Sequence, residues 1–146
     1  GVGPASWAPR KDEPELDGHG HHKLQPMRNL PAVSVAAGKD PRGMPVKAGD
    51  GEIMGEVTDL WIDVPEQMIR YLEYKIADGS TRIVPFTLAR VWRGKVLVRS
   101  IFSTHAAGVP TVAKPDVITK LEEDKISAYY AGGILYASEE RQETLL

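Results

Sequence analysis

The 146-residue chain contains no cysteine, which excludes disulfide bonds and thiolate chemistry. It also lacks surplus positive charge, because 18 lysines and arginines face 20 acidic residues and give a net charge of -2. Nucleic-acid binders owe much of their affinity to surplus lysine and arginine, so this class is disfavoured. No apolar run approaches the roughly 18 residues of a membrane-spanning helix, and no stretch has the pattern of a secretory signal peptide.

The length is that of one domain, and the composition is ordinary for a globular protein, with 42% hydrophobic and 26% charged residues. The sequence starts at Gly1 without an initiator methionine, so we expect it to be a piece of a longer polypeptide. Three zones follow from the pattern. We predict an extended arm over 1–43, a β-barrel over 44–110, and a linker with helices over 111–146.

The predicted arm is rich in proline, glycine and charge, and six prolines interrupt it between residues 4 and 41. Such a stretch forms helices and sheets poorly. It nevertheless carries apolar residues that could anchor it to a surface. These are Trp7, Leu16, Leu24, Met27 and Leu30. We therefore expect the arm to lie against other parts of the molecule.

Residues 44 to about 102 have the pattern of short β-strands. Apolar and polar residues alternate over 53–63 until both faces become apolar, as in a barrel or sandwich. Further strands are predicted over 68–76, 81–85, 88–92 and 95–99. Asp78-Gly79 is a hairpin signal, and Arg93-Gly94 marks another turn. The prediction is a small antiparallel barrel with a core that includes Trp61, Tyr71 and Leu72.

The C-terminal zone is predicted to be helical. Thr119-Lys120-Leu121-Glu122 is a capping box, and the acidic residues at 122–124 suit the positive end of the helix dipole. We predict a helix over 119–137 and a second short helix after Ser138. Gly132-Gly133 either weakens the first helix or lets another segment approach its backbone. The fold class is thus mainly β with C-terminal helix.

The most informative polar segment is Asp17-Gly18-His19-Gly20-His21-His22. In an extended backbone, Asp17, His19 and His21 would leave the same face, which could gather a carboxylate and two imidazoles around a divalent metal ion. The same residues could collect protons, because histidine titrates near neutral pH. A merely polar loop explains the pattern equally well. A closed zinc site would need a fourth ligand, which only His22 could supply.

A second group of titratable residues follows the strand predicted at 53–63. Asp63 and Glu66 flank a turn, and Arg70 follows on the next strand. Burial raises the pKa of a carboxyl group and a nearby arginine lowers it, so such residues could be balanced for proton transfer. The residues alone favour a simpler interpretation, in which Asp63 forms the turn and Glu66 pairs with Arg70 at the surface.

Four stretches together resemble the H subunit of the purple-bacterial photosynthetic reaction centre. The resemblance covers essentially the whole chain. It rests on residues 1–7 (GVGPASW), 14–27 around Asp17-Gly18-His19-Gly20-His21, 55–73 with DLWIDVPEQ, and 121–133 with LEEDK and YYAGG. The family also has an N-terminal transmembrane helix that is absent here, so the resemblance implies the cytoplasmic part alone. It implies a PRC-type β-barrel, packed beneath the L and M subunits at the cytoplasmic face of the inner (intracytoplasmic) membrane.

The resemblance also implies a function. The family's H subunit has no catalytic residue and binds no pigment, while bacteriochlorophyll, quinone and iron belong to the partner subunits. It stabilises the complex and supports proton uptake to the secondary quinone during light-driven cyclic electron transport. Positions matching Asp17, His19 and His21 form the proton entrance, where zinc or cadmium can bind. Positions matching Asp63, Glu66 and Arg70 lie further along the route, with Arg70 near Glu66.

Two other functions remain open. A PRC-barrel module of a ribosome maturation factor would predict a basic or protein-docking face, which the net charge of -2 suits poorly. A metal-dependent hydrolase at Asp17, His19 and His21 would need a further base and an oxyanion stabiliser, and neither occurs at a recognisable spacing. No nucleic-acid partner is predicted in either case.

Overall fold

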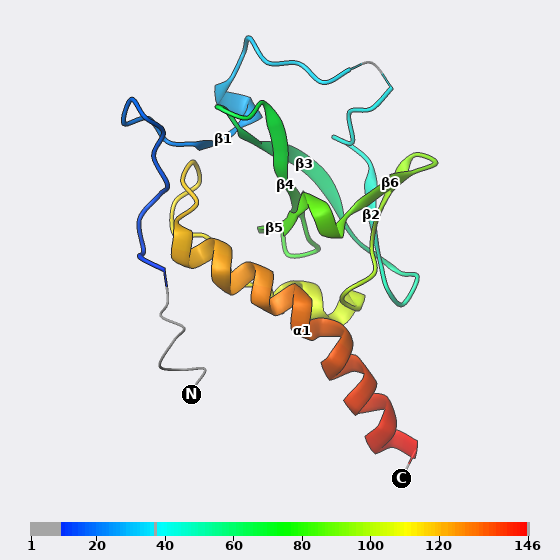
Figure 1. The fold of residues 1–146 in the computed structure, drawn as a ribbon. Helices are drawn as coiled ribbons and strands as arrows, with labels where there is room; N and C mark the ends of the chain where they lie inside the picture. The colour runs from blue at the N-terminus through cyan, green and yellow to red at the C-terminus, as the bar shows by residue number, and fades with distance from the viewer. Residues whose placement is uncertain (1–9, 37, 146) are drawn as a thin grey trace.

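The computed structural model describes residues 10–36 and 38–145, with side chains as far as residue 133. The motif over residues 1–7, with its predicted anchor Trp7, lies outside this part of the chain. Figure 1 shows an N-terminal arm, a curved sheet and a long helix whose far end extends beyond the sheet. No helix in the described ranges is long and apolar enough to cross a membrane.

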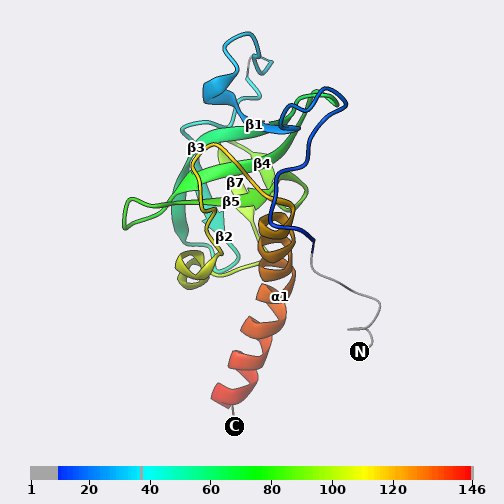
Figure 2. The same cartoon turned by 90° about the vertical axis from the view of Figure 1, so that its left-hand side faces the viewer.

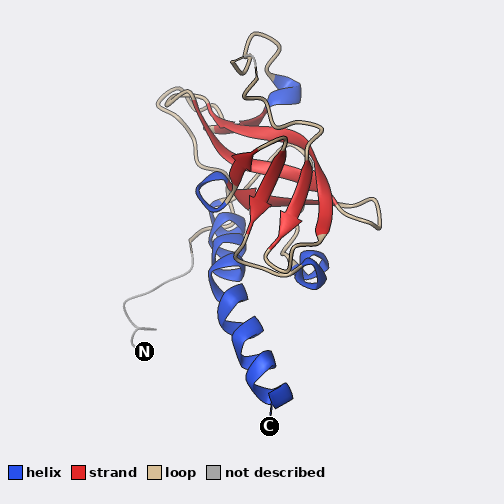
Figure 3. Cartoon of the chain, turned by 90° about the vertical axis from the view of Figure 1, so that its right-hand side faces the viewer, coloured by secondary structure: helices blue, strands red, loops and turns tan. Residues whose placement is uncertain are grey.

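Seven strands form one sheet in the order β5-β4-β3-β2-β7-β6, and β1 pairs with β3 beside this path. Figure 3 shows how strongly the sheet curves, with the helix along one side. The strands are β1 (Leu24–Pro26), β2 (Pro45–Ala48), β3 (Ile53–Asp63), β4 (Met68–Lys75), β5 (Thr81–Pro85), β6 (Arg90–Trp92) and β7 (Lys95–Val98). Three 3-10 turns join them: η1 (Met27–Asn29), η2 (Phe86–Leu88) and η3 (Ser103–Gly108).

The predicted mainly β fold is confirmed, with two differences in the sheet. Strands β2 and β7 pair in parallel, with Val46 opposite Val96, whereas an all-antiparallel barrel was predicted. The sheet is also not closed, because the pairings of the described strands end at β5 on one side and at β6 on the other. The parallel pair arises because β7 returns along β2 after the chain has passed through four intervening strands.

The predicted hairpin turns are present. Gly79 has φ +86° in the turn between β4 and β5, where a residue with a side chain would be strained. Arg93 and Gly94 both have positive φ, 50° and 76°, in the two-residue turn between β6 and β7. This pair of conformations matches the twist of a tight hairpin.

The core lies between the concave face of the sheet and the helix. The predicted core residues Trp61, Tyr71 and Leu72 are all buried. Burial on both faces near the end of β3 explains why its sequence becomes continuously apolar there. The other large side chains with almost no exposed surface are Tyr74, Tyr130, Leu60, Ile101, Ile118 and Ile126.

The C-terminal zone forms a single helix, α1 (Lys120–Leu145), and not the two helices predicted around Ser138. The capping box is confirmed, because Glu122 N–H donates to Thr119 Oγ1 while Thr119 N–H donates to Glu122 Oε1. Gly133 allows the close approach predicted for Gly132-Gly133. A Cβ atom there would lie 2.4 Å from the carbonyl oxygen of Ser100.

The arm runs along the start of α1, as Figure 2 shows from the side. The backbone N–H groups of Lys120 and Leu121 donate to the carbonyl oxygens of Glu13 and Lys11. These N–H groups belong to the first turn of the helix, where no carbonyl oxygen within the helix can accept their hydrogen bonds. The expectation that the arm lies on the molecule is therefore confirmed for the residues described.

Candidate functional site

The segment from Asp17 to His21 forms a tight turn and not the extended backbone that was expected. One oxygen of Asp17 accepts hydrogen bonds from the backbone N–H groups of His19 and His21, at 2.8 and 2.9 Å. The backbone also closes on itself, since Asp17 N–H donates to the carbonyl of His21 at 2.8 Å. The short aspartate side chain thus substitutes for a backbone acceptor and folds the segment over.

The turn brings the predicted metal ligands near one another without forming a metal-binding group. Nδ1 of His21 lies 3.7 Å from Oδ2 of Asp17, and the rings of His19 and His21 are 6.4 Å apart. Within the described ranges, no three histidine, aspartate or glutamate side chains are already grouped as metal ligands. Zinc binding at Asp17, His19 and His21 stays a prediction, and it requires the side chains to rearrange.

Electrostatics favour the charged form of the carboxylate in this turn. Hydrogen bonds from the backbone N–H groups of His21 and His19 hold the pKa of Asp17 below its usual value. The side chain of His21 is 73% exposed. The turn therefore presents a permanent negative charge beside two histidines that solvent protons reach directly.

The turn leads straight into β1, which places it at the Asp63 end of β3. Leu24 pairs with Asp63 in the sheet, and Val64 N–H donates to the carbonyl of Lys23 at 2.9 Å. No local pattern indicated this pairing, because the two segments are about 40 residues apart. The two predicted groups of titratable residues thus belong to the same end of the molecule.

Asp63 is a buried carboxylate with a partly exposed cation beside it. Its side chain is 2% exposed, and Oδ2 accepts a hydrogen bond from Nε of Arg70 at 3.1 Å. Oδ1 accepts the backbone N–H of Glu66 at 3.1 Å, which holds the turn that had been predicted for Asp63. Both carboxylate oxygens therefore have partners, as burial of a charge requires.

Glu66 lies in the exposed turn between β3 and β4. The expected pairing of Arg70 with Glu66 is not what the structure contains, because Arg70 pairs with Asp63. Among the described residues, the Glu66 carboxylate takes part in no ion pair. The Glu66 side chain is therefore open to solvent.

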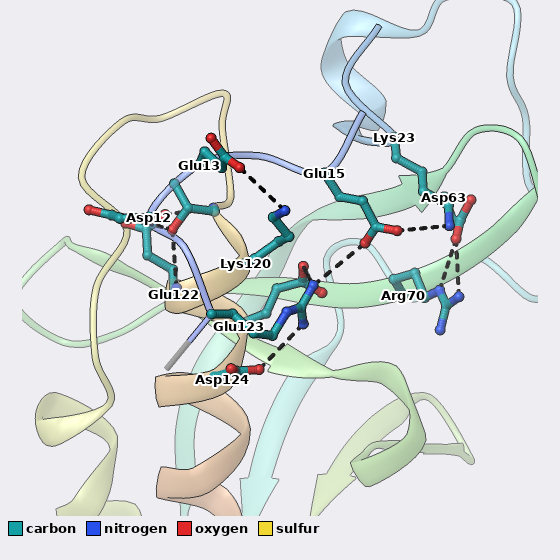
Figure 4. A network of polar contacts seen from close by, with 12 residues as sticks. Asp12, Glu13, Glu15, Lys23, Asp63, Arg70, Lys120, Glu122, Glu123 and Asp124 are labelled. Carbon is teal, nitrogen blue, oxygen red and sulfur yellow. Dashed lines mark hydrogen bonds and ion pairs between the residues drawn. The ribbon is translucent and has the colours of Figure 1, made fainter. Parts of the chain in front are cut away.

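A polar cavity of about 220 Å³ adjoins Asp63. Its charged lining includes three cations and three anions from the arm, the strands β3 and β4, and α1. Figure 4 shows the polar contacts among residues of this region. Arg10 lies 3.6 Å from Glu15 and 3.8 Å from Glu123, and Lys23 donates to Glu15 at 3.2 Å. The lining residues are Arg10, Glu15, Lys23, Leu24, Asp63, Arg70 and Glu123.

Glu123 is the acid that α1 contributes to this cavity. Burial raises its pKa above the usual value, although the Tyr71 hydroxyl opposes this by donating to Oε1 at 2.7 Å. Oε2 is buried without a hydrogen bond, its nearest cation being Arg10 at 3.8 Å. Sequence reasoning had assigned residues 122–124 to helix capping and missed this role, which depends on an arginine more than 100 positions earlier.

A second charged network was also missed. Arg28 donates to Asp59 at 2.9 Å and to Asp116 at 3.0 Å, and it lies 3.3 Å from Glu73. Its guanidinium also lies 5.7 Å from the centre of the Trp61 ring. The network fastens η1 to β3, β4 and the segment before α1. Asp59 and Glu73 lie opposite each other on β3 and β4, but this pairing of two acids is visible only in the folded sheet.

Comparison with protein families agrees with this architecture. Residues 34–104 match the PRC-barrel domain, and residues 1–29 match the photosynthetic reaction centre, H-chain N-terminal region. Together the two matches support a reaction centre H-subunit-like protein. The resemblance seen in the sequence is thereby confirmed. The two matches cover the Asp17–His21 turn and the region of Asp63, Glu66 and Arg70.

The H-chain match also separates two interpretations that the barrel alone would leave open. A ribosome maturation factor could share the PRC-barrel, but the match over 1–29 is to the reaction centre H chain. H chains are non-catalytic subunits of a membrane-associated reaction centre complex. The H-chain match therefore implies association with a reaction centre complex.

Proposed function

We propose that this H-subunit-like protein takes up protons at the cytoplasmic face of the inner membrane and relays them toward the secondary quinone. The Asp17–His21 turn collects protons, and Asp63 and Glu66 pass them on toward the L and M subunits, while Arg70 balances the charge of Asp63. The same packing stabilises the complex of H with L and M. Pigments, quinone and iron remain with the partner subunits.

The observation that carries this proposal is the position of Asp63. Its buried carboxylate adjoins a cavity lined by titratable side chains, and the turn with His19 and His21 enters the sheet beside it. Proton relays need acids and bases whose charges are balanced by neighbours, so that either form is accessible. Arg70, at 3.1 Å, compensates the negative charge of the buried Asp63 carboxylate.

The test uses the intact complex with Glu66→Gln. We expect slower proton uptake coupled to the second electron on the secondary quinone, with unchanged primary charge separation. Glutamine keeps the size of glutamate and removes its titration, so a change of shape does not explain a defect. Because Arg70 pairs with Asp63, the substitution also leaves this ion pair intact.

Glu56→Gln is the matched control, since Glu56 is an exposed acid on the same strand pair, away from the cavity. A small weak acid can carry protons past position 66. If lost proton delivery causes the defect, adding such an acid restores the rate of proton uptake in Glu66→Gln. An unaltered second-electron rate in Glu66→Gln would remove Glu66 from the route.

A further inference from the structure

Five cations gather around the hairpin of β6 and β7. This hairpin forms one end of the sheet, and β5 forms the other end. Most arginines elsewhere in the described ranges are paired with a carboxylate, as Arg10, Arg28, Arg42 and Arg70 are. The five near this hairpin form no ion pair with any described residue. They are Lys47, Arg90, Arg93, Lys95 and Arg99.

An exposed tryptophan lies at the centre of these cations. Trp92 is 41% exposed, whereas Trp61 is completely buried. The charged groups of Arg90, Arg93 and Lys95 lie 5.9, 4.5 and 5.9 Å from the centre of the Trp92 ring. Three cations over one indole hold the ring at the surface, where it presents both a flat apolar face and an N–H group.

A groove of about 300 Å³ continues from the tryptophan, and its lining contains no acidic residue. Lys47, Lys95 and Arg99 supply its charge, and backbone at Gly49 and Gly51 forms part of its floor. Two carboxylates, Asp50 and Glu52, lie in the turn between β2 and β3, next to Gly49 and Gly51 of the lining. Asp50 accepts hydrogen bonds from the N–H and hydroxyl of Ser103, which leaves exposed Glu52 as the one unengaged acid of that turn.

Apolar side chains accompany the cations along this edge. Leu88 and Val91 are 39% and 37% exposed, and all three residues of β6 face solvent. Cations alone would suffice to stop an edge strand from pairing with another sheet. Exposed Val91 and Trp92 favour such pairing, so protection of the edge does not explain them. The combination of clustered cations with an exposed indole and aliphatic side chains is typical of surfaces that meet a lipid headgroup layer.

We propose that this surface, the Trp92 patch (Lys47, Arg90, Trp92, Arg93, Lys95 and Arg99), binds the phosphate headgroups of anionic phospholipids. The cations attract the negatively charged membrane surface, and Trp92 enters the interface between headgroups and acyl chains. The chain as a whole is acidic, so the attraction is local to the patch. H chains belong to a membrane-associated complex, so anionic lipids occur in the surroundings of such a protein.

The first test measures sedimentation of the full 146-residue chain with vesicles of phosphatidylcholine alone and of phosphatidylcholine with phosphatidylglycerol. We expect binding to the anionic vesicles, loss of that binding at high salt, and little binding to the neutral vesicles. Arg90→Gln with Lys95→Gln removes two cations beside Trp92, and roughly 10- to 30-fold weaker binding is expected. Lys39→Gln with Lys114→Gln is the control, because it removes the same charge from two exposed lysines elsewhere.

The second test follows the tryptophan itself. Anionic vesicles are expected to shift the fluorescence of the chain to shorter wavelength, and this shift disappears in Trp92→Phe while Trp61 continues to report the folded core. Equal vesicle binding by the two charge variants would overturn the proposal. So would binding of polyglutamate or free phosphate without binding of anionic vesicles, which would assign the patch to an acidic protein or to a small anion.

Discussion

The hydroxyl oxygens of Tyr74 and Tyr130 lie 2.7 Å apart in the core, between β4 and α1. Tyr130 donates its single proton to the carbonyl oxygen of Ile83 at 2.9 Å, so Tyr74 must donate to Tyr130. Burial raises the pKa of Tyr74 to about 12, and it raises the pKa of Tyr130 well above its usual value. Both side chains are therefore neutral links in a chain of hydrogen bonds that joins the helix to the sheet.

The direction of this chain predicts unequal effects of removing each hydroxyl. Tyr130→Phe leaves both the Tyr74 hydroxyl and the Ile83 carbonyl without a partner, so we expect a loss of about 1–3 kcal/mol in unfolding free energy. Tyr74→Phe leaves the bond from Tyr130 to Ile83 intact, and about 1 kcal/mol is expected. Urea unfolding measures both. Equal losses would contradict the assigned direction.

Glu123 predicts a particular dependence of stability on pH. Burial raises its pKa above the ordinary 4.5, so the folded state binds this proton more tightly than the unfolded state does. Protonation of Glu123 therefore stabilises the folded state. This contribution to the unfolding free energy is complete below pH 4.5 and is lost as pH rises through the raised pKa. Relative to the parent, Glu123→Gln is therefore expected to gain stability with rising pH across that window, and denaturant unfolding at several pH values checks this.

Asp124→Asn is the control for this experiment, since Asp124 is the other acid of α1 in contact with Arg10, at 3.3 Å. If loss of the contact with Arg10 governed the effect, both variants would show the same dependence on pH. A constant difference between Glu123→Gln and the parent would mean that Glu123 titrates normally.

The ion pair of Asp63 and Arg70 predicts a coupled effect on stability. Arg70→Met leaves the Asp63 carboxylate buried without its cation, and a loss of about 1–3 kcal/mol is expected. Adding Asp63→Asn removes the isolated charge while an amide oxygen still accepts the N–H of Glu66. The double variant is therefore expected to recover part of the loss, as a double-mutant cycle measures. Simple additivity would show that the pair is not coupled.

Zinc titration tests the Asp17–His21 turn. Weak binding is expected at neutral pH, because Asp17 stays ionised and two imidazoles lie beside it. Binding falls below about pH 6 as histidine becomes protonated. His19→Ala with His21→Ala abolishes it, whereas His22→Ala leaves it nearly unchanged if His22 is not a ligand. Unaltered calorimetric titrations of the double variant would move the metal elsewhere.

The close packing of α1 predicts that a single methyl group destabilises the protein. Gly133→Ala improves helix propensity, but its Cβ would lie 2.4 Å from the Ser100 carbonyl and 2.5 Å from Cγ2 of Ile101. We expect a net loss of roughly 1–3 kcal/mol in thermal or denaturant unfolding. Gly18→Ala is the control, since no atom lies within 4 Å of the added carbon. Equal stability of the two variants would contradict this packing.

Local patterns predicted the elements that local interactions create. The capping box at Thr119 and the turns at Gly79 and Gly94 depend on residues within a few positions of one another, and all three are present. The alternation over β3 predicted the strand because burial repeats every second residue. The break expected near Ser138 is absent, since serine can continue a helix as well as begin one.

Interactions between distant segments were not predictable in this way. The parallel pairing of β2 with β7 depends on how the whole chain turns back, which no window of sequence contains. Arg28 reaches Asp59 and Asp116, which are 31 and 88 positions away. At the candidate site, the residue types were predicted but their contacts were not. Arg70 pairs with Asp63 because a buried carboxylate is costly without a cation beside it.

The hydrogen bonds between the arm and α1 have a consequence for how the molecule is made. Thr119 donates to Asp12 across 107 positions, so the arm leaves the ribosome long before its partner has been translated. The sheet can form in the meantime with β1 paired to β3, but Lys11 and Glu13 lack the amides of α1 that they bind. The cavity takes Arg10 and Glu15 from the arm and Glu123 from the helix. It therefore comes into existence only when synthesis has passed α1, and an incomplete chain would present a barrel without it.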